Sequence, residues 1–236
     1  MRLKLFVAIL ALLPMPALAD VTARYSTGKD VLLVEIDDNG NARVGIDGQF
    51  GLIRRDGTDY AVMIGADGET RVVELAELIE LMGGANKASA GTANPAIERA
   101  NFLLIAKGEA TVAGRVGVIW SFGPEKENDG RPGEMLEVVM SADPTLAPIG
   151  TLLRRMMGTL QPFVAMIVPE ASGFYPKAVE LAAKGAPLRV AKIELQSIDT
   201  ADIAAARFDL PAPVISAAEF AATMGSGPNM EVQPLP

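Results

Sequence analysis

Hydrophobic and polar residues alternate with a period of two through residues 22–73, in short runs separated by turn dipeptides. Asn39-Gly40, Asp47-Gly48, Asp56-Gly57 and Asp67-Gly68 lie roughly ten residues apart, and such pairs supply the positive φ angles of tight hairpins. The pattern predicts an antiparallel meander of five or six strands. The expected strands cover residues 22–25, 31–36, 42–46, 50–55, 60–64 and 70–73.

The period changes to that of a helix at residues 74–82, where Leu75, Leu78, Ile79 and Met82 fall on one face. We expect a short amphipathic helix that ends at Gly83-Gly84, because glycine is the common residue at helix ends. Residues 84–96 are small and polar, which predicts a flexible loop inside one domain.

Residues 102–122 carry the next alternating pattern and contain the only tryptophan, Trp120. Apolar and polar positions alternate on both sides of Lys107-Gly108-Glu109, so the pattern predicts a half-buried hairpin that turns at these three residues.

The rest of the chain predicts a mixture of strands and helices. Asp143-Pro144-Thr145 has the cap and turn chemistry of a helix start, and the helix that follows is expected to kink at Pro162. The other expected elements are strands at 134–140 and 187–195 and helices at 175–184 and 216–224. The fold class is therefore mainly β with helices (α+β), in one domain over residues 20–215, followed by a short helix and a disordered tail in 216–236.

The first 19 residues are typical of a secretory signal. Arg2 and Lys4 precede an apolar run that is too short to span a bilayer, and Ala17-Leu18-Ala19 has the form of a signal cleavage site. We expect cleavage between Ala19 and Asp20, and a periplasmic protein without a transmembrane span.

Composition excludes several classes of function. The chain has no histidine, which removes serine–histidine and cysteine–histidine catalysis and the usual zinc ligand. It has no cysteine, so the domain has no disulfide. The formal net charge of −8 disfavours nucleic acid as a partner. The carboxylate pairs Asp37 with Asp38 and Glu125 with Glu127 lie in expected turns or loops, so we expect no enzyme activity, no cofactor and no metal.

Apolar residues that adapt to varied ligands gather in the second half of the chain. Methionine has a flexible thioether side chain that suits a deformable pocket, but the same spacing is consistent with ordinary core packing or, with less support, with Cu(I) bound by thioethers. The candidate pocket lining consists of Trp120, Met140, Met156, Met157, Phe163 and Met166.

The order of short signals in the second half resembles a family of exported bacterial proteins. Thr111-Val112-Ala113-Gly114 leads into the Trp120 strand, Gly185-Ala186-Pro187-Leu188 opens a strand, and Phe208-x-Leu210-Pro211 closes the fold. That family, known as a domain of unknown function, is similar to the lipoprotein carrier LolA, its receptor LolB and the sigma-factor regulator RseB. The resemblance covers roughly residues 21 to 213.

The resemblance implies a curved, unclosed antiparallel sheet, or half-barrel, with helices plugging its concave face. In LolA-type proteins that face holds lipid acyl chains, although no residue dedicated to lipoprotein transfer is matched here. The expected function is non-catalytic binding, and possibly carriage, of an apolar or amphiphilic ligand such as a lipid. The alternative is an envelope protein-interaction or sensory module in which helices fill the sheet completely.

Overall fold

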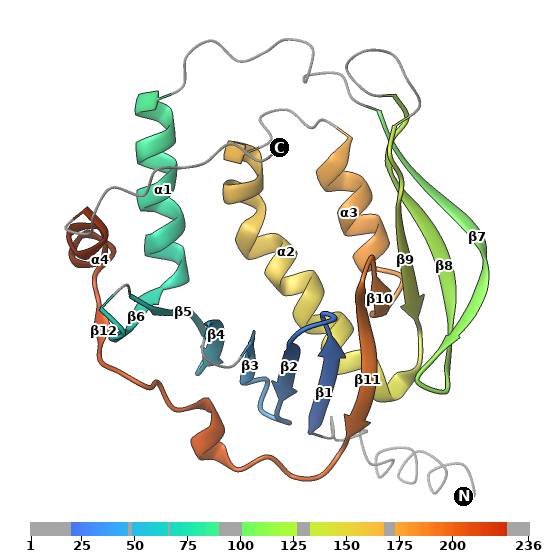
Figure 1. The fold of residues 1–236 in the computed structure, drawn as a ribbon, viewed down its shortest axis with the longest axis horizontal. Coiled ribbons are helices and arrows are strands. Elements are labelled where there is room, and N and C mark those ends of the chain that lie inside the picture. Colours follow the sequence, from blue (N-terminus) through green and yellow to red (C-terminus); the bar gives the residue numbers. More distant parts are fainter. Residues whose placement is uncertain are drawn as a thin grey trace, which may run out of the picture.

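The computed structural model describes residues 20–46, 49–65, 67–89, 101–126, 133–167 and 173–225, with the backbone alone described at residues 50, 84–89, 163–167 and 224–225. Within these residues the fold is mainly β, with a large unclosed sheet and four α-helices (Figure 1). The predicted signal, including Ala19, lies outside the described residues, whereas Asp20 lies inside them. None of the helices in the described part is long and apolar enough to cross a membrane.

The described strands form one 12-stranded sheet in the order β12-β6-β5-β4-β3-β2-β1-β11-β10-β9-β8-β7. Adjacent strands are antiparallel except for β12, which pairs parallel with β6. The strands are β1 (Val21–Ser26), β2 (Val31–Ile36), β3 (Ala42–Ile46), β4 (Phe50–Arg55), β5 (Thr58–Ile64), β6 (Thr70–Glu74), β7 (Phe102–Val112), β8 (Arg115–Pro124), β9 (Leu136–Ser141), β10 (Ala186–Val190), β11 (Ile193–Asp199) and β12 (Val214–Ile215). The helices are α1 (Leu75–Ser89), α2 (Ala147–Ile167), α3 (Phe174–Ala182) and α4 (Ala217–Gly225), with 3₁₀ turns η3 (Pro144–Leu146) and η4 (Ala205–Phe208).

The meander of β1–β6 agrees with the predicted strands. The bounds of β2, β3 and β4 are the predicted ones, and Gly40, Gly57 and Gly68 in the turns adopt positive φ angles of 80°, 87° and 81°. Hairpin turns of this kind depend on local backbone chemistry, which is why sequence alone locates them.

The predicted turn at Lys107-Gly108-Glu109 is wrong. Strand β7 continues through these residues to Val112, and the chain turns at Ala113-Gly114, which have φ angles of 48° and 75°. Two consecutive positive φ angles suit a two-residue hairpin. Gly108, at a φ of 149°, instead lies at a bulge in β7, where the register with β8 shifts.

The predicted strand at 187–195 is two strands joined by a tight turn. Strand β10 ends at Val190, Ala191 takes a positive φ of 50°, and β11 returns antiparallel from Ile193. The apolar positions Val190 and Ile193 are three residues apart, so the alternation changes phase there. That phase change marks the turn.

Helix α1 is longer than predicted, because it passes through Gly83-Gly84 and ends at Ser89. The first part of the predicted loop 84–96 is therefore helical. Glycine costs a helix about 1 kcal/mol relative to alanine, and packing along a neighbouring helix outweighs this cost: α1 lies against α2.

Helix α2 joins the two halves of the sheet. It follows η3, whose N-cap Asp143 accepts a hydrogen bond from the Thr145 backbone N–H at 2.9 Å, as predicted from the cap sequence. Leu146, Ile149 and Leu152 pack in one core cluster with residues of β1, β2, β10 and β11. Figure 1 shows α1, α2 and α3 on the same side of the sheet, which bends around them.

The opposite side of the meander is crossed by a C-terminal segment, residues 200–213, which we call the strap. It leaves β11, forms η4 against β3 and β4, and ends in β12 beside β6 (Figure 1). Phe208 of the strap is only 2% exposed. After β12, α4 (Ala217–Gly225) agrees with the predicted helix at 216–224 and packs through Ala217 and Phe220 on Val73.

Candidate functional site

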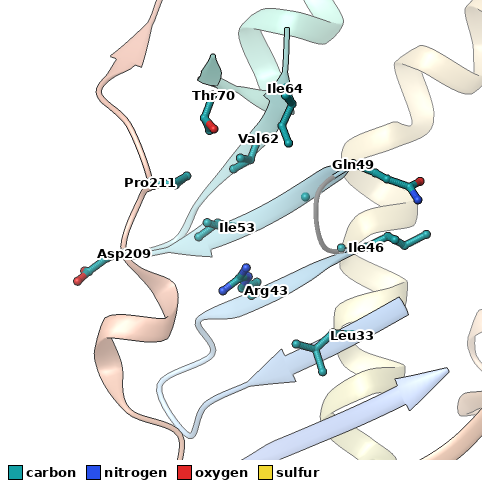
Figure 2. A pocket seen from close by; sticks show the side chains of 12 residues that line it. Leu33, Arg43, Ile46, Gln49, Ile53, Val62, Ile64, Thr70, Asp209 and Pro211 are labelled. Atoms are coloured by element: carbon teal, nitrogen blue, oxygen red, sulfur yellow. The ribbon is translucent and has the colours of Figure 1, made fainter. Parts of the chain in front are cut away.

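A groove of about 200 Å³ lies between the strap and the face of β2–β6 that is turned away from the helices. Its lining is mainly apolar, and the strap closes one side (Figure 2). The lining residues are Leu33, Arg43, Gly45, Ile46, Gln49, Gly51, Ile53, Val62, Ile64, Thr70, Asp209 and Pro211.

The alternation of strand side chains explains which residues reach this groove. Along β3, Ala42 and Val44 point to the helix side and pack in the core cluster with α2, so Arg43 and Gly45 point to the groove side. Register pairs share a face of the sheet, and Arg43 pairs with Ile53 of β4. Leu33, Arg43 and Ile53 thus reach the groove from the side of the strands that faces away from the helices. Ile46 and Gln49 lie at one end of the groove, and their side chains point away from the other lining residues (Figure 2).

Two glycines without side chains make the floor of the groove. Gly45 of β3 and Gly51 of β4 are direct register partners, so the sheet has no side chain at either position. A Cβ added at Gly51 would lie 3.6 Å from the Val44 carbonyl oxygen and 3.7 Å from the Val62 Cβ. These are ordinary contacts, so the backbone does not need glycine for lack of space. The missing side chains leave the volume of the groove open.

The strap is held on the sheet by one buried ring and by polar contacts. The Arg207 guanidinium donates two hydrogen bonds to the carboxylate of Glu35, a 6% exposed residue on β2, at 2.9 and 2.8 Å. Arg55 of β4 donates to Asp209 at 2.9 Å. At the start of the strap the Asp20 carboxylate accepts a hydrogen bond from the Ile203 N–H. These contacts fix the strap as the wall of the groove.

Two charged residues line the groove, and they are oriented differently. Figure 2 shows Arg43 between Leu33 and Ile53, whereas the side chain of Asp209 points outward, away from the strands. The Asp209 carboxylate is also the acceptor for Arg55. The charge that lies among the apolar residues is therefore the half-buried guanidinium of Arg43.

None of the predicted pocket residues is among those that line the groove. Met140 is 2% exposed within β9, and Met156 packs against the main core cluster. Met156 also lines a cavity of about 20 Å³ between α2 and strands β3 and β4, together with Leu152 and Thr159. That volume is close to the space that one water molecule needs.

Trp120 and Met157 are not brought into that cavity. The Lys184 ammonium lies 4.9 Å from the centroid of the Trp120 ring, and the Trp120 Nε1 is buried without a hydrogen-bond partner in the part of the chain described. Met157 lies in α2, where its carbonyl oxygen accepts from the Tyr175 hydroxyl at 3.3 Å. The side chains of Phe163 and Met166 lie outside the described residues.

Next to Trp120, three phenylalanines connect α3 to the β7–β8 hairpin. The Phe174 ring meets the Phe102 and Phe122 rings edge-on, with centroids 5.4 and 5.5 Å apart. Edge-to-face contacts at such distances are favourable packing. This aromatic cluster serves to anchor α3 on the sheet.

The carboxyl groups have the chemistry of structural contacts. The Asp37 carboxylate accepts from the Asn41 backbone and side chain at 2.7 and 2.8 Å, which closes the β2–β3 turn, and Glu127 lies outside the described residues. Hydrogen bonds and ion pairs lower the pKa of several carboxyl groups, the largest cause being Arg71 for Asp67 and the Thr145 N–H for Asp143. The described residues contain no group of three or more acidic side chains placed to hold a metal ion.

The sequence did not lead us to predict a role for the two groove glycines, although their spacing around the Asp47-Gly48 turn could have indicated one. Gly45 and Gly51 lie three residues to either side of Gly48 in the predicted Asp47-Gly48 turn. A hairpin centred there pairs them, and glycine inside a strand often marks a close approach by a ligand or another backbone. The strap, in contrast, depends on contacts between residues more than 150 positions apart, such as Arg55 with Asp209.

No protein-family model, no curated protein and no solved structure matches the chain. The likeness to the LolA, LolB and RseB group therefore rests on the order of short motifs in the sequence and stays a prediction.

Proposed function

We propose that the protein is a non-catalytic binding protein of the bacterial periplasm, and that its ligand is apolar or amphiphilic. The observation that carries the proposal is the groove of about 200 Å³ with the paired glycines Gly45 and Gly51 in its floor. Leu33, Ile53 and Val62 provide the apolar surface. Burying a ligand methylene against such a surface contributes about 0.8 kcal/mol.

The volume sets the size of the bound group. At about 30 Å³ for each group of the size of a water molecule, the groove holds roughly seven non-hydrogen atoms. This suits a short acyl segment or a single ring and is smaller than most drug-sized pockets. The proposal is therefore binding of one apolar group rather than enclosure of a whole lipid.

The proposal places the ligand on the outer face of the meander, not on the face that carries the helices. We propose that α2 and its neighbours plug the concave face. The packing of Leu146, Ile149 and Leu152 into the core supports this, as does the small cavity of about 20 Å³ beside Met156. An acyl chain on the helix side would require α2 to move away from β3 and β4.

The absence of catalysis is also part of the proposal. A general acid or base needs a pKa near the working pH, which usually means a raised carboxyl pKa. In the described residues the carboxyl groups with displaced pKa values are all lowered, namely Asp67, Asp143, Glu180 and Glu219. All four are held as carboxylates by donors beside them.

The test fills the groove and measures ligand binding. In Gly51→Leu the added side chain starts at ordinary contact distances and extends into the groove. Gly158→Leu is the matched control, because Gly158 is exposed on α2 and a Cβ there meets nothing within 4 Å. Binding of 1-octanol and of octanoate is measured by saturation-transfer NMR on the purified protein.

We expect both ligands to receive saturation from the unmodified protein and from Gly158→Leu, and the effect to fall at least tenfold in Gly51→Leu. Equal signals in both variants would show that binding does not use the groove and would refute the proposed site. Absence of any signal from the unmodified protein would refute the function.

A protein-interaction module is the second candidate. The observation in its favour is the small size of the cavity between α2 and β3–β4. If helices fill the concave face of the sheet completely, only the outer surface of the molecule is available to bind a partner protein. Native mass spectrometry of protein isolated from the periplasm separates the two. A stoichiometric amphiphile in the organic extract supports the first candidate, whereas a clean apo mass together with a co-isolated protein supports the second.

A further inference from the structure

We infer that the ligand of the groove is a small, uncharged molecule with one flat aromatic ring, and that the ring lies on the paired glycines Gly45 and Gly51. The inference rests on the proposed function, which accepts either a short acyl segment or a single ring, and it selects the ring. It also commits to a free molecule rather than to an aromatic side chain of a partner protein.

The register of the strands places the two glycines between apolar walls. Gly45 pairs with Leu33 of β2 on one side and with Gly51 on the other, and Gly51 pairs in turn with Val62 of β5. Register partners share a face of the sheet, and neighbouring strands lie about 4.8 Å apart. Leu33 and Val62 are therefore separated by three strand spacings, about 14 Å, and the floor between them is bare backbone.

A third wall stands along the direction of the strands. Ile53 follows Gly51 two residues further along β4, so it lies on the same face, and it is 5% exposed. Figure 2 shows Pro211 of the strap pointing toward the strands on this side of the groove. The bare floor is thus enclosed by side chains that rise above it.

The flat floor favours a flat ligand. An aromatic ring lies against the peptide groups with its whole face and meets the walls with its edges. A saturated ring is puckered, so only some of its atoms touch the same floor. Aromatic side chains are used to cover strand glycines in a similar way.

Internal freedom distinguishes a ring from an acyl segment of equal size. A bound alkyl chain gives up rotation about its bonds, and this loss of entropy opposes binding. An aromatic ring has no such rotations to lose. The groove of about 200 Å³ exceeds the volume of about 150 Å³ that is sufficient for an apolar cavity to bind benzene.

The charged residues of the lining favour an uncharged ligand, because both already take part in interactions within the protein. The Asp209 carboxylate accepts from Arg55 at 2.9 Å, and Figure 2 shows its side chain pointing outward. Arg43 is likewise engaged within the chain. A charged ligand would give up hydration among the apolar walls without a dedicated partner, which is unfavourable.

Area favours a free molecule over a partner protein. One buried aromatic side chain accounts for about 150–250 Å², whereas a stable protein interface takes about 800 Å² from each partner. The strap already covers the outer face beside the groove: η4 contacts β3 and β4, and Phe208 is 2% exposed. A protein partner would need the area that the strap occupies.

The experiment compares three seven-carbon alcohols: benzyl alcohol with a flat ring, cyclohexylmethanol with a puckered ring and 1-heptanol with a flexible chain. Dissociation constants are measured by NMR titration at pH 7. Benzoate and benzylammonium test the charge of the ligand, and N-acetylphenylalaninamide tests a ring attached to a peptide backbone.

The variants alter the floor by one methyl group or fill the groove. In Gly51→Ala the added Cβ lies 3.6 Å from the Val44 carbonyl oxygen and 3.7 Å from the Val62 Cβ, so the sheet accommodates it. Gly51→Leu fills the groove. Gly158→Ala is the control, because a Cβ there meets nothing within 4 Å. Urea denaturation of each variant checks that it is folded.

We expect benzyl alcohol to bind the unmodified protein about fivefold more tightly than either other alcohol, since favourable ring geometry adds to the burial of area. Burial of area alone predicts that 1-heptanol binds most tightly, because it has the largest apolar surface of the three. Gly51→Ala should weaken benzyl alcohol about tenfold, because the methyl group holds the ring off the backbone. A flexible chain bends past the methyl group, so 1-heptanol should hardly change. Gly158→Ala should leave all three alcohols unchanged.

Ring-current shifts locate the ring directly. Protons above the face of an aromatic ring move upfield in the NMR spectrum. Bound benzyl alcohol should therefore shift the Hα protons of Gly45 and Gly51 upfield, and cyclohexylmethanol should not. Upfield shifts confined to other residues would place the ring elsewhere and overturn the inference.

The outcomes separate this inference from the proposed function. If 1-heptanol binds most tightly and Gly51→Leu abolishes binding of all three alcohols, the groove binds ligands but the ring is wrong. A preference for benzyl alcohol that survives in Gly51→Ala shows that the floor does not select the ring. Tighter binding of benzoate or benzylammonium overturns the uncharged ligand. If N-acetylphenylalaninamide binds more tightly than benzyl alcohol and depends equally on Gly51, the groove receives a side chain of a partner protein and the free molecule is wrong. If no alcohol binds, both proposals fall.

Discussion

Replacing Phe208 by alanine tests whether the strap is an integral part of the fold. Phe208 is 2% exposed and lies in η4, which rests on β3 and β4. Its removal takes away the ring that fixes the strap on the outer face of the sheet. The polar contacts on both sides of it, from Arg207 to Glu35 and from Arg55 to Asp209, remain available.

The expected loss of unfolding free energy in Phe208→Ala follows from the burial of the Phe208 ring. A Phe→Ala change in a packed core costs about 3–5 kcal/mol, the sum of lost transfer free energy and the cavity that remains. The lower end applies here, because η4 is a single exposed turn that can settle toward the sheet. We expect a loss of about 3 kcal/mol in the free energy of unfolding, which is a fall of about 1.5 M in the urea midpoint for a slope near 2 kcal/mol/M.

The assay is urea unfolding followed by the fluorescence of Trp120, the only tryptophan in the chain. Trp120 lies in β8 and the strap lies on β3 and β4, so the signal reports unfolding of the whole domain. The control is Arg55→Ala. It removes an ion pair whose side chains are 46% and 60% exposed, so it should cost no more than about 0.5 kcal/mol.

Two outcomes would refute the reasoning. If Phe208→Ala leaves the urea midpoint where Arg55→Ala leaves it, the strap does not contribute to global stability. If amide exchange in residues 200–213 becomes fast while the Trp120 transition is unchanged, the strap opens as a separate unit and is not part of one cooperative fold.

Two further predictions concern pH. Burial raises the pKa of the Tyr25 hydroxyl, so the contribution of this hydroxyl to stability is complete below its unfolded pKa of about 10 and is lost as the pH rises above that value. Tyr25→Phe should cost about 1 kcal/mol at pH 7, since the hydroxyl donates to the Pro187 carbonyl oxygen at 2.9 Å. The substitution should also flatten the decline of the urea midpoint between pH 9 and 11. The Thr145 N–H, followed by the Thr145 hydroxyl and Arg115, lowers the pKa of Asp143. The contribution of the Asp143 carboxylate to stability is therefore present above its unfolded pKa of about 3.9 and disappears as the pH falls. Asp143→Ala should cost about 1 kcal/mol at pH 7 and clearly less at pH 3, and an equal cost at both pH values would contradict the role of Asp143 as a helix cap.

Local chemistry explains how much of the fold was predictable. Residues 31–36, 42–46 and 50–55 were located to the residue, because glycine turns and side-chain alternation act over a few positions. The error in the β7–β8 hairpin arose where two turn signals competed. Lys107-Gly108 forms a bulge, and the true turn is at Ala113-Gly114, where the positive φ of Ala113 is not evident from its residue type.

The candidate groove was not predictable as a site for a different reason. Its floor uses glycines whose importance appears only when β3 and β4 are paired in register. Its wall is the strap, which reaches the meander through contacts such as Arg207 with Glu35, 172 residues apart in the sequence. Pattern analysis of single segments identifies apolar side chains such as Met140, but it cannot separate core residues from pocket residues.

The order of the strands has a consequence for folding. The meander made first, β1–β6, has two open edges, and both are covered by the end of the chain: β11 pairs with β1, and β12 pairs with β6. An open strand edge is a template for intermolecular pairing. Until β11 and β12 have paired, the meander exposes both edges, so intermolecular strand pairing competes with the last steps of folding.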